Sequence, residues 1–454
     1  MNSVQRQVKS IGTPQARKGA ENQSAVDALV FLIPCLQFIQ IRLVGALSGC
    51  DLLLLGVFIY LAFNEKFRLA TPLGRRFLLF GSLWLVSQCV TDIVRHSAFI
   101  DYARGWSNIG LTVVNFTVLY TLLYKRPWRL FLYGWGLAVG SVLWFLIHPT
   151  ESMVSGDGNA WKFGWAYPAT MAVFLIACSK QCSGQWPVIL AAAIGVINML
   201  LGARSMGGVC LAAALYLEVM NPLRGEGAEI AKLKAVTVIF LAGSILLSVV
   251  GVMWAYGYAA SGGYLGEQAQ KKYGDQASGQ YGVLLGGRPE LLSELPAIYD
   301  SPILGHGSWA KEPLYLIEEH ESMVALGYKD EQFIDPDQLA EGQIPAHSYF
   351  FQAWVDGGIL GAVFWGWVFV VTAKALTRIY PKTVELLPTM AFLAFLLLWN
   401  IPFSPFGTQE RITFPYSFVV LMSCLGVLPA KAVRATVRKA KRKISPALTP
   451  RPQH

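Results

Sequence analysis

The sequence predicts an all-α membrane protein, a polytopic bundle of about twelve transmembrane helices with one long loop that carries short helices. Three observations lead to this prediction. First, 54% of the 454 residues are hydrophobic and only 14% are charged, whereas about a quarter are charged in soluble proteins. Second, apolar runs of about 20 residues, enough to cross a bilayer, recur along most of the chain. Third, seven cysteines are too few for a disulfide scaffold in a chain of this length.

The candidate spans follow one another with short polar connections between them. They are 27–47, 50–64, 77–94, 106–124, 128–147, 164–178, 186–203, 206–220, 235–258, 349–373, 386–402 and 412–429. One long break separates the last three from the others. We therefore expect an N-terminal tail (1–25), a first transmembrane part (26–258), a loop domain (259–345), a second transmembrane part (346–430) and a basic C-terminal tail (431–454).

Charge predicts how the chain crosses the membrane. With the N-terminus in the cytoplasm, most of the 37 lysine and arginine residues fall in cytoplasmic connections and tails, as is usual for membrane proteins. Both termini are then cytoplasmic, and the loop domain, in which acidic residues outnumber basic ones, lies outside. No cleavable signal peptide is evident. The basic C-terminal tail favours contact with anionic membrane lipids over contact with nucleic acid.

Arg204 is the first candidate for a functional site. It follows the apolar run 186–203 in a connection too short to carry it far from the bilayer. A helix of that length rises about 27 Å, which places Arg204 near the outer boundary of the hydrocarbon. The arginine then either anchors the helix by reaching toward the headgroups or binds an anion at the depth of a lipid phosphate.

The second candidate is Arg288, within the segment Gly286–Glu290. Two glycines permit a tight turn, Pro289 suits the first position of a helix, and Glu290 favours a helix N-terminus. The pattern predicts a short amphipathic helix that ends at Asp300 and lies against the membrane or the bundle. Its apolar face would consist of Leu291, Leu292, Leu295, Ile298 and Tyr299. Arg288 then either contributes to an anion site at the helix start or forms a salt bridge within the loop.

The third candidate is His347, where the loop domain re-enters the membrane. Ser348, Gln352 and Asp356 recur every four residues and give the next helix a polar stripe. Such a stripe faces a cavity or the bundle interior, because lipid penalises polar groups. A histidine here can accept a proton near neutral pH, or it is only a solvated group at a helix start.

Other polar residues are weaker candidates. Arg42, Arg95, Arg104 and Arg411 lie near the predicted outer face, where they either extend an anion site or anchor helices. Gln352 and Asp356 of the polar stripe are weak candidates for substrate contacts. We expect His306 in a turn, and Asn115 and Asn198 in hydrogen bonds between helices.

The sequence predicts neither a metal nor another cofactor. Glu318–Glu321 contains three acids and a histidine, but four consecutive residues of a helix do not converge on one ion. No nucleotide-phosphate loop, nucleophile elbow or dinucleotide fingerprint occurs. No feature specifies an oligomeric state.

Taken in order, these features resemble those of a known family. The Arg204-Ser205 hairpin precedes a long loop with Gly287-Arg288 and the run Asp-Ser-Pro-Ile-Leu-Gly-His-Gly, and His347 precedes a span containing Gly-Gly-Ile-Leu-Gly. The chain thus resembles the superfamily of O-antigen ligases and O-antigen polymerases, which are bacterial membrane glycosyltransferases of the GT-C class. The resemblance is clearest over 186–373. The family often has Asn after the histidine and Ser or Thr before the first arginine, whereas this chain has Ser348 and Ala203.

The resemblance implies a metal-independent, inverting transfer at the periplasmic face of the bacterial inner membrane. The donor would be a glycan on undecaprenyl diphosphate, and the acceptor a hydroxyl of lipid A-core, another glycan or a protein. The resemblance assigns diphosphate binding to Arg204 and Arg288 and the role of acceptor base to His347, without separating a ligase from a polymerase. Residue chemistry agrees, since paired arginines can neutralise a leaving diphosphate and histidine can remove a proton.

Two other classes of function are open at this point. A flippase or other transporter of lipid-linked glycans would also use many spans and outer arginines, but it needs functional charges near the middle of the membrane. A non-catalytic assembly subunit would need no such site. The outer position of the candidate residues favours the enzyme.

Overall fold

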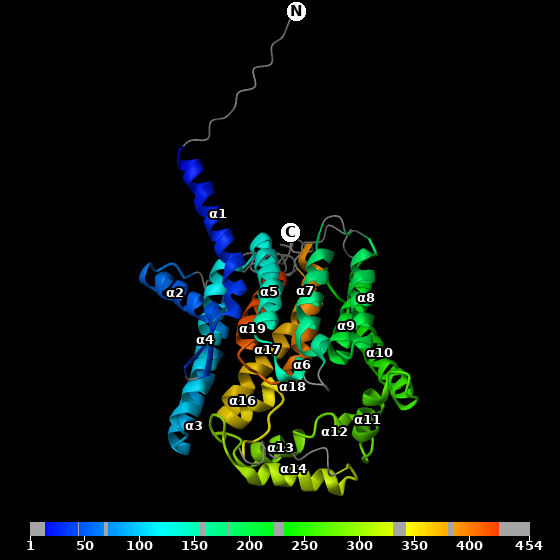
Figure 1. Ribbon diagram of the computed structural model, residues 1–454. Coiled ribbons are helices and arrows are strands. Elements are labelled where there is room, and N and C mark those ends of the chain that lie inside the picture. The colour runs from blue at the N-terminus through cyan, green and yellow to red at the C-terminus, as the bar shows by residue number, and fades with distance from the viewer. Residues whose placement is uncertain are drawn as a thin grey trace, which may run out of the picture.

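The computed structural model describes residues 14–43, 45–67, 71–154, 159–179, 182, 184–221, 231–329, 342–379 and 385–425. The chain is mainly helical, which confirms the all-α prediction. Figure 1 shows long helices side by side in a bundle, with a layer of short helices across one end of it. We call this end the loop end. The predicted tail 431–454 lies outside the described residues.

The first five helices build one side of the bundle. They are α1 (Pro14–Cys35), α2 (Gly49–Phe63), α3 (Pro72–Arg95), α4 (Phe99–Leu123) and α5 (Pro127–Ile147). The start of α2 has a capping box, in which Ser48 accepts from the Asp51 amide and Asp51 accepts from the Ser48 amide. Proline opens α3 and α5, where its missing amide proton costs nothing.

The next helices lead to the long break. They are α6 (Glu151–Val154), the π-helical turn η2 (Trp161–Trp165), α7 (Ala166–Ala177), α8 (Trp186–Leu200), α9 (Arg204–Met220) and α10 (Ala235–Ser261). Gly202, with φ +83°, makes the tight corner between α8 and α9. Close packing of the two helices requires Gly207, because a Cβ there would lie 2.8 Å from the carbonyl oxygen of Gly195.

The described part of the long break contains four short helices, and the sequence predicts short helices here. They are α11 (Glu267–Gln276), α12 (Gly282–Gly286), α13 (Leu291–Asp300) and α14 (Pro313–Ala325). The chain then returns to the bundle as α16 (Tyr349–Gly357), α17 (Ile359–Thr377), α18 (Leu387–Phe403) and α19 (Glu410–Cys424). In Figure 1, α11 to α14 lie across the loop end of the bundle.

Two predicted spans are wrong in detail. The span 27–47 ends as a helix at Phe38, after the 3-10 turn η1 (Leu36–Phe38), and continues as a hairpin of β1 (Gln40–Leu43) and β2 (Gly45–Ser48). The span 349–373 is broken at Gly358 into α16 and α17. The break has a steric cause, since Gly358 has φ +69° and a Cβ there would lie 2.0 Å from the Ile303 carbonyl oxygen. A second small sheet pairs β3 (Ala231–Lys232) with β4 (Arg378–Ile379).

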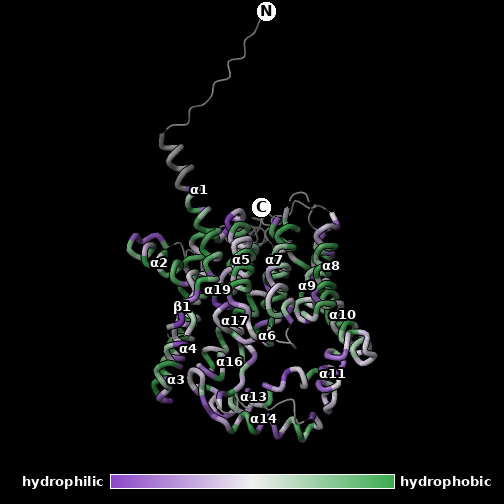
Figure 2. The backbone as a smooth tube through the Cα atoms, viewed as in Figure 1, coloured by the Kyte–Doolittle hydropathy of each residue, from purple (hydrophilic) through white to green (hydrophobic). Residues whose placement is uncertain are grey.

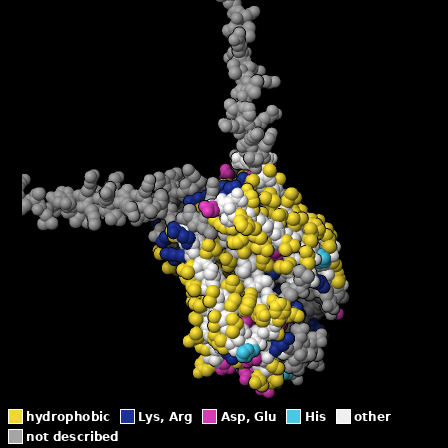
Figure 3. Space-filling model, turned by 90° about the vertical axis from the view of Figure 1, so that its left-hand side faces the viewer, with side chains coloured by type: hydrophobic (Ala, Val, Ile, Leu, Met, Phe, Trp, Pro, Cys, Tyr) yellow, Lys and Arg dark blue, Asp and Glu magenta, His cyan; other side chains and the backbone are white. Residues whose placement is uncertain are grey.

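The surface of the bundle suits a membrane. Five described helices, α3, α4, α5, α10 and α17, are long and apolar enough to span a bilayer, and several shorter helices are also apolar. Figure 2 shows hydrophobic residues along the bundle helices and hydrophilic ones concentrated in the layer below them. In Figure 3, apolar side chains cover the middle of one face and charged groups gather toward its two ends. The chain is therefore a membrane-embedded helical protein.

Several polar groups inside the bundle are paired across helices. Arg411 Nη2 donates to Asp51 Oδ2 at 2.6 Å, and Asn115 Nδ2 donates to Asp51 Oδ1 at 3.1 Å. Asn198 Nδ2 donates to Thr170 Oγ1 at 2.9 Å. The interhelical bonds predicted for both asparagines are confirmed. Arg411, by contrast, neutralises a buried carboxylate and is not part of an open anion site.

Candidate functional site

The loop domain is fastened to the bundle through Asp92 of α3. Its carboxylate accepts hydrogen bonds from the Ser308 amide at 2.6 Å, the Ser308 hydroxyl at 2.7 Å and the Trp106 indole at 2.7 Å. Arg95, one turn further along α3, donates to Ser301 Oγ at 2.8 Å and to the Gly305 carbonyl at 3.1 Å. Arg95 therefore anchors the loop, which is a structural role for this weak candidate.

His306 was expected in a turn, but it lies in the irregular segment 305–307 between two turns, and it is buried there. Gly305 and Gly307 on either side of it have φ +84° and +97°. The ring nitrogens of His306 lie 2.7 Å from Glu312 Oε1 and 2.7 Å from the Ala297 carbonyl oxygen. This pairing ties α13 to the segment before α14.

The buried face of α13 differs from the predicted one. Leu295 and Tyr299, expected on the packed face, are largely exposed, whereas Ser293 and Glu294 are buried. The reason is hydrogen bonding rather than hydropathy. Ser293 Oγ donates to Glu319 Oε2 of α14 at 2.5 Å, and Glu294 accepts from the start of α16. Within the described part of the chain, the side chains of Glu318–Glu321 do not form a group that could hold a metal ion.

His347 sits against the start of α13. Its backbone amide donates to Glu294 Oε1 at 2.9 Å, and its ring Nδ1 lies 3.4 Å from Glu290 Oε1. Its side chain remains 49% exposed, so its other ring nitrogen is accessible to a ligand. The next residue, Ser348, caps α16 by accepting from the Phe351 amide at 3.0 Å.

Two carboxyl groups close to His347 have raised pKa values. Burial raises the pKa of the Glu294 carboxyl to about 8, with the His347 amide and the Arg288 charge opposing this rise and the charges of Glu290 and Glu319 adding to it. Burial likewise raises the pKa of Glu319 to about 7. Glu294 is therefore mostly protonated at neutral pH.

Arg288 lies between α12 and α13, with its guanidinium donating to the Gly287 carbonyl at 2.9 Å. Gly286 is needed here for close packing rather than for a left-handed turn, because a Cβ would lie 2.2 Å from the Gln276 carbonyl oxygen. The chain is thus held against the end of α11. No described residue forms an ion pair with Arg288, so the loop salt bridge considered from the sequence is absent from the described part of the chain.

Arg204 is the first residue of α9, and its guanidinium carbon lies 4.4 Å from the centre of the Tyr256 ring in α10. Such stacking on an aromatic face orients the guanidinium and leaves its N–H donors free. One further cation lies close by, at Lys162 of η2. The pKa of the Lys162 ammonium is lowered to about 8, first by partial burial and then by the like charges of Lys272, Arg204 and Arg288.

Arg204, Arg288 and His347 are therefore related through shared neighbours, by charge interactions and by one hydrogen bond. Arg204 and Arg288 both act on Lys162, which lies just ahead of α7. Arg288 also acts on Glu294, whose carboxylate holds the amide of His347. Exposed charges more than about 10 Å apart are largely screened at 0.1 M salt. The structure thus brings residues far apart in sequence to the loop end of the bundle.

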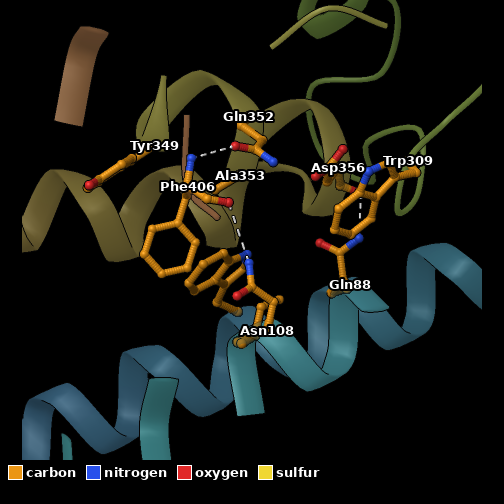
Figure 4. A pocket seen from close by; sticks show the side chains of 11 residues that line it. Gln88, Asn108, Trp309, Tyr349, Gln352, Ala353, Asp356 and Phe406 are labelled. Atoms are coloured by element: carbon orange, nitrogen blue, oxygen red, sulfur yellow. Dashed lines mark hydrogen bonds between the residues drawn. The ribbon is translucent and has the colours of Figure 1, made fainter. Parts of the chain in front are cut away.

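The remaining weak candidates lie elsewhere. Gln352 and Asp356 line a small pocket with Gln88 of α3 and Asn108 of α4 (Figure 4). About 20 Å³ of this pocket is open to the centre of a water molecule, which is room for about one water. The polar stripe thus faces the bundle interior, as predicted, but not a substrate-sized space. Arg42 is exposed on β1, which Figure 2 shows beside α4, on the opposite side of the bundle from α8 to α10.

Lys162, Glu290 and Glu294 are the residues of this region whose roles sequence reasoning missed. Lys162 was visible as a lone cation in Trp-Lys-Phe-Gly-Trp at the outer end of an apolar run. Glu290 and Glu294 carried the signal of acids on the polar side of a short helix, which normally indicates a solvated face.

The comparisons with known proteins add no assignment. No family model matches the chain, and no curated protein sequence matches it.

Proposed function

We propose that the protein is an integral-membrane, metal-independent glycosyltransferase that moves a glycan from undecaprenyl diphosphate to an acceptor hydroxyl at the periplasmic face of the bacterial inner membrane. The observation that supports the proposal is that Arg204, Arg288 and His347 all lie on elements at the loop end of the bundle, at the start of α9, just before α13 and just before α16. Cations on one side and a partly exposed imidazole on the other are what a diphosphate leaving group and an acceptor hydroxyl require.

The proposed reaction is a direct displacement. The acceptor oxygen forms a bond to the anomeric carbon of the donor glycan while the bond from that carbon to the diphosphate oxygen breaks. The electron pair of the broken bond leaves with the diphosphate, whose new charge Arg204 and Arg288 would neutralise. The acceptor proton passes to Nε2 of His347. Attack opposite the leaving group inverts the anomeric centre.

Glu290 supports the assignment of His347 as the base. Its carboxylate lies 3.4 Å from Nδ1, on the side of the ring away from Nε2. A carboxylate in this position favours the tautomer with a proton on Nδ1, which leaves a lone pair on Nε2. It also stabilises the imidazolium that forms when the acceptor proton arrives.

The apolar surface beside Arg204 would accommodate the polyprenyl tail. Helix α10 packs mainly against α9 and α11, and most of its described apolar side chains are exposed. Tyr256 of α10 contacts Arg204, so the apolar surface of this helix continues directly into the cationic region. A lipid with a diphosphate head has a matching arrangement, because its apolar tail is joined directly to an anionic group.

The buried charges favour an enzyme over a transporter. Asp51 pairs with Arg411 at 2.6 Å, and Asp27 pairs with Arg129 at 2.7 Å. These described charges of the bundle neutralise one another, whereas a transporter needs functional charges along its path through the membrane. Transport of the lipid-linked glycan is the alternative that the experiment must separate from transfer.

The test is reconstitution of the purified protein in vesicles with undecaprenyl diphosphate that carries a short glycan. Lipid A-core or a second copy of the lipid-linked glycan is supplied as acceptor, and mass spectrometry detects new glycosidic bonds. Transfer to lipid A-core indicates a ligase, and growth of the glycan a polymerase. Translocation of the donor without a new bond would instead identify a transporter.

Substitution assigns the roles. Arg204→Ala, Arg288→Ala and His347→Ala should each lower transfer by about 100-fold or more. Arg76→Ala and His96→Asn are matched controls at exposed positions, and they should retain transfer. Asparagine is chosen for His96 because this residue has φ +54°. Near-normal transfer by a site variant would refute the role given to that residue.

A further inference from the structure

We propose that Lys162 is a third cationic side chain of the diphosphate site, completing with Lys272 a cradle whose other members are Arg204 and Arg288. The inference rests on the proposed function and names further residues for its substrate site. The four side chains come from four separate parts of the chain: η2, α9, α11 and the connection before α13.

The position of Lys162 is fixed by Asn159. The Asn159 side chain donates to the Leu201 carbonyl at 3.0 Å and accepts from the Lys162 amide at 2.7 Å. Gly202 allows this contact, because a Cβ there would lie 2.7 Å from the Asn159 amide nitrogen. The segment before α7 is thereby clamped to the corner that leads into Arg204.

A second clamp holds the same segment. The Trp161 indole donates to Asn198 Oδ1 at 2.9 Å, so the residue before Lys162 is tied to the last turn of α8. The ammonium of Lys162 lies 4.5 Å from the centre of the Phe163 ring. Neighbouring atoms partly desolvate the Lys162 ammonium, but the residue as a whole is exposed, so a ligand at the loop end of the bundle can reach it.

Aromatic contacts extend the cluster to α11. The Tyr256 ring, which stacks on Arg204, meets the Tyr273 ring edge-on at a centre-to-centre distance of 6.0 Å. Gly257 allows this approach, since a Cβ there would lie 2.5 Å from the Tyr273 hydroxyl. Lys272 precedes Tyr273, and its charge acts on the Lys162 ammonium.

The cluster lacks its own counter-charge. None of the four cations forms an ion pair with another described residue, although Arg288 attracts the Glu294 carboxyl without contacting it. Four like charges held together repel one another, and a bound polyanion relieves that repulsion. A diphosphate carries negative charge on two adjacent phosphates, which matches cations that approach from several sides.

The test measures binding separately from transfer. Purified protein in nanodiscs is titrated with undecaprenyl diphosphate that carries no glycan, and bound lipid is quantified by native mass spectrometry. Lys162→Ala should weaken binding about tenfold or more, and Lys162→Arg should stay within about threefold of wild type. Lys271→Ala removes the same charge from the same helix as Lys272 and should leave binding unchanged.

The outcomes separate this inference from the proposed function. If Arg288→Ala loses binding while Lys162→Ala binds like wild type, Lys162 is not in the site and the inference fails alone. If the lysine variant loses binding but wild type forms no glycosidic bond with any acceptor, the cradle stands and the transferase proposal fails. If wild type does not bind the lipid, both are overturned.

Discussion

Nδ1 of His347 lies 3.4 Å from Oε1 of Glu290, which stands at the start of α13. Because the carboxylate orients the imidazole, Glu290→Gln should lower kcat for transfer by about 10- to 100-fold while the KM for the lipid-linked donor changes little. Glu290→Asp should recover part of the loss, since it keeps the charge. Steady-state kinetics in the reconstituted system measures both constants.

The control for this change is Glu318→Gln, which removes an exposed acid from α14. Its kinetics should match wild type. A Glu290→Gln variant with raised donor KM and unchanged kcat would show that Glu290 supports donor binding and does not position His347.

Glu294 makes stability depend on pH. Its pKa is raised from 4.5 to about 8 by burial in the folded protein. The unfolded chain therefore loses this proton first as the pH rises, so the stabilising contribution is complete below about pH 4.5 and is lost as the pH passes 8. The apparent Tm should fall by about 5 °C between pH 5.5 and 8.5.

Glu294→Gln should flatten this dependence, because glutamine keeps the acceptor for the His347 amide and does not ionise. Glu319, whose pKa is raised to about 7, adds a change of the same sign and keeps the slope from vanishing. Glu318→Gln should keep the full slope. An unchanged slope in Glu294→Gln would mean that Glu294 is already ionised in the folded protein at neutral pH.

Hydropathy was sufficient to predict most helices, since lipid requires long apolar stretches and a helix satisfies its own backbone. It could not predict the break at Gly358, which depends on the Ile303 carbonyl oxygen lying where a Cβ would project. Nor could it predict the first span's early end, because the residues after Phe38 are as apolar as those in a helix but pair as a hairpin.

The candidate site likewise has residues that the sequence could predict and residues that it could not. Arg204 and His347 could be chosen from the sequence because each is a polar group at the edge of an apolar run, and Arg288 because it stands between two glycines and a predicted helix start. The buried face of α13 could not, since Glu294 is buried by a hydrogen bond to a residue 53 positions away. Lys162 depends in the same way on Asn159, whose bond to Leu201 joins two connections of the bundle.

Asp92 should control the docking of the loop domain. Its carboxylate accepts from Ser308, Trp106 and the Ser97 hydroxyl, the last at 2.7 Å. Asp92→Asn removes the charge and turns two acceptor sites into donors, so it should destabilise the docked loop by about 2–4 kcal/mol. Hydrogen exchange of residues 301–309 should rise. Asp101→Asn, which loses only a 3.8 Å pair with exposed Lys311, should cost less than about 1 kcal/mol.

The affinity for undecaprenyl diphosphate should depend on pH through the titration of the Lys162 ammonium. Its ammonium has a pKa lowered to about 8, and the charged groups that act on it are Lys272 of α11, Arg204 of α9 and Arg288 before α13. The attraction is therefore present below pH 8 and fades above it. Between pH 7 and 9 wild type should lose about fivefold in affinity, whereas Lys162→Arg should lose little, because a guanidinium stays charged.

Lys162→Ala completes the comparison, since its affinity should equal that of wild type at pH 9 and fall below it only as the pH drops toward 7. This convergence is the outcome that charge at one position predicts and that a folding defect does not, because a misfolded site would bind weakly at every pH. If wild type and Lys162→Arg instead lose affinity in parallel, the titrating group lies elsewhere, and the lysine contributes no charge to the cradle.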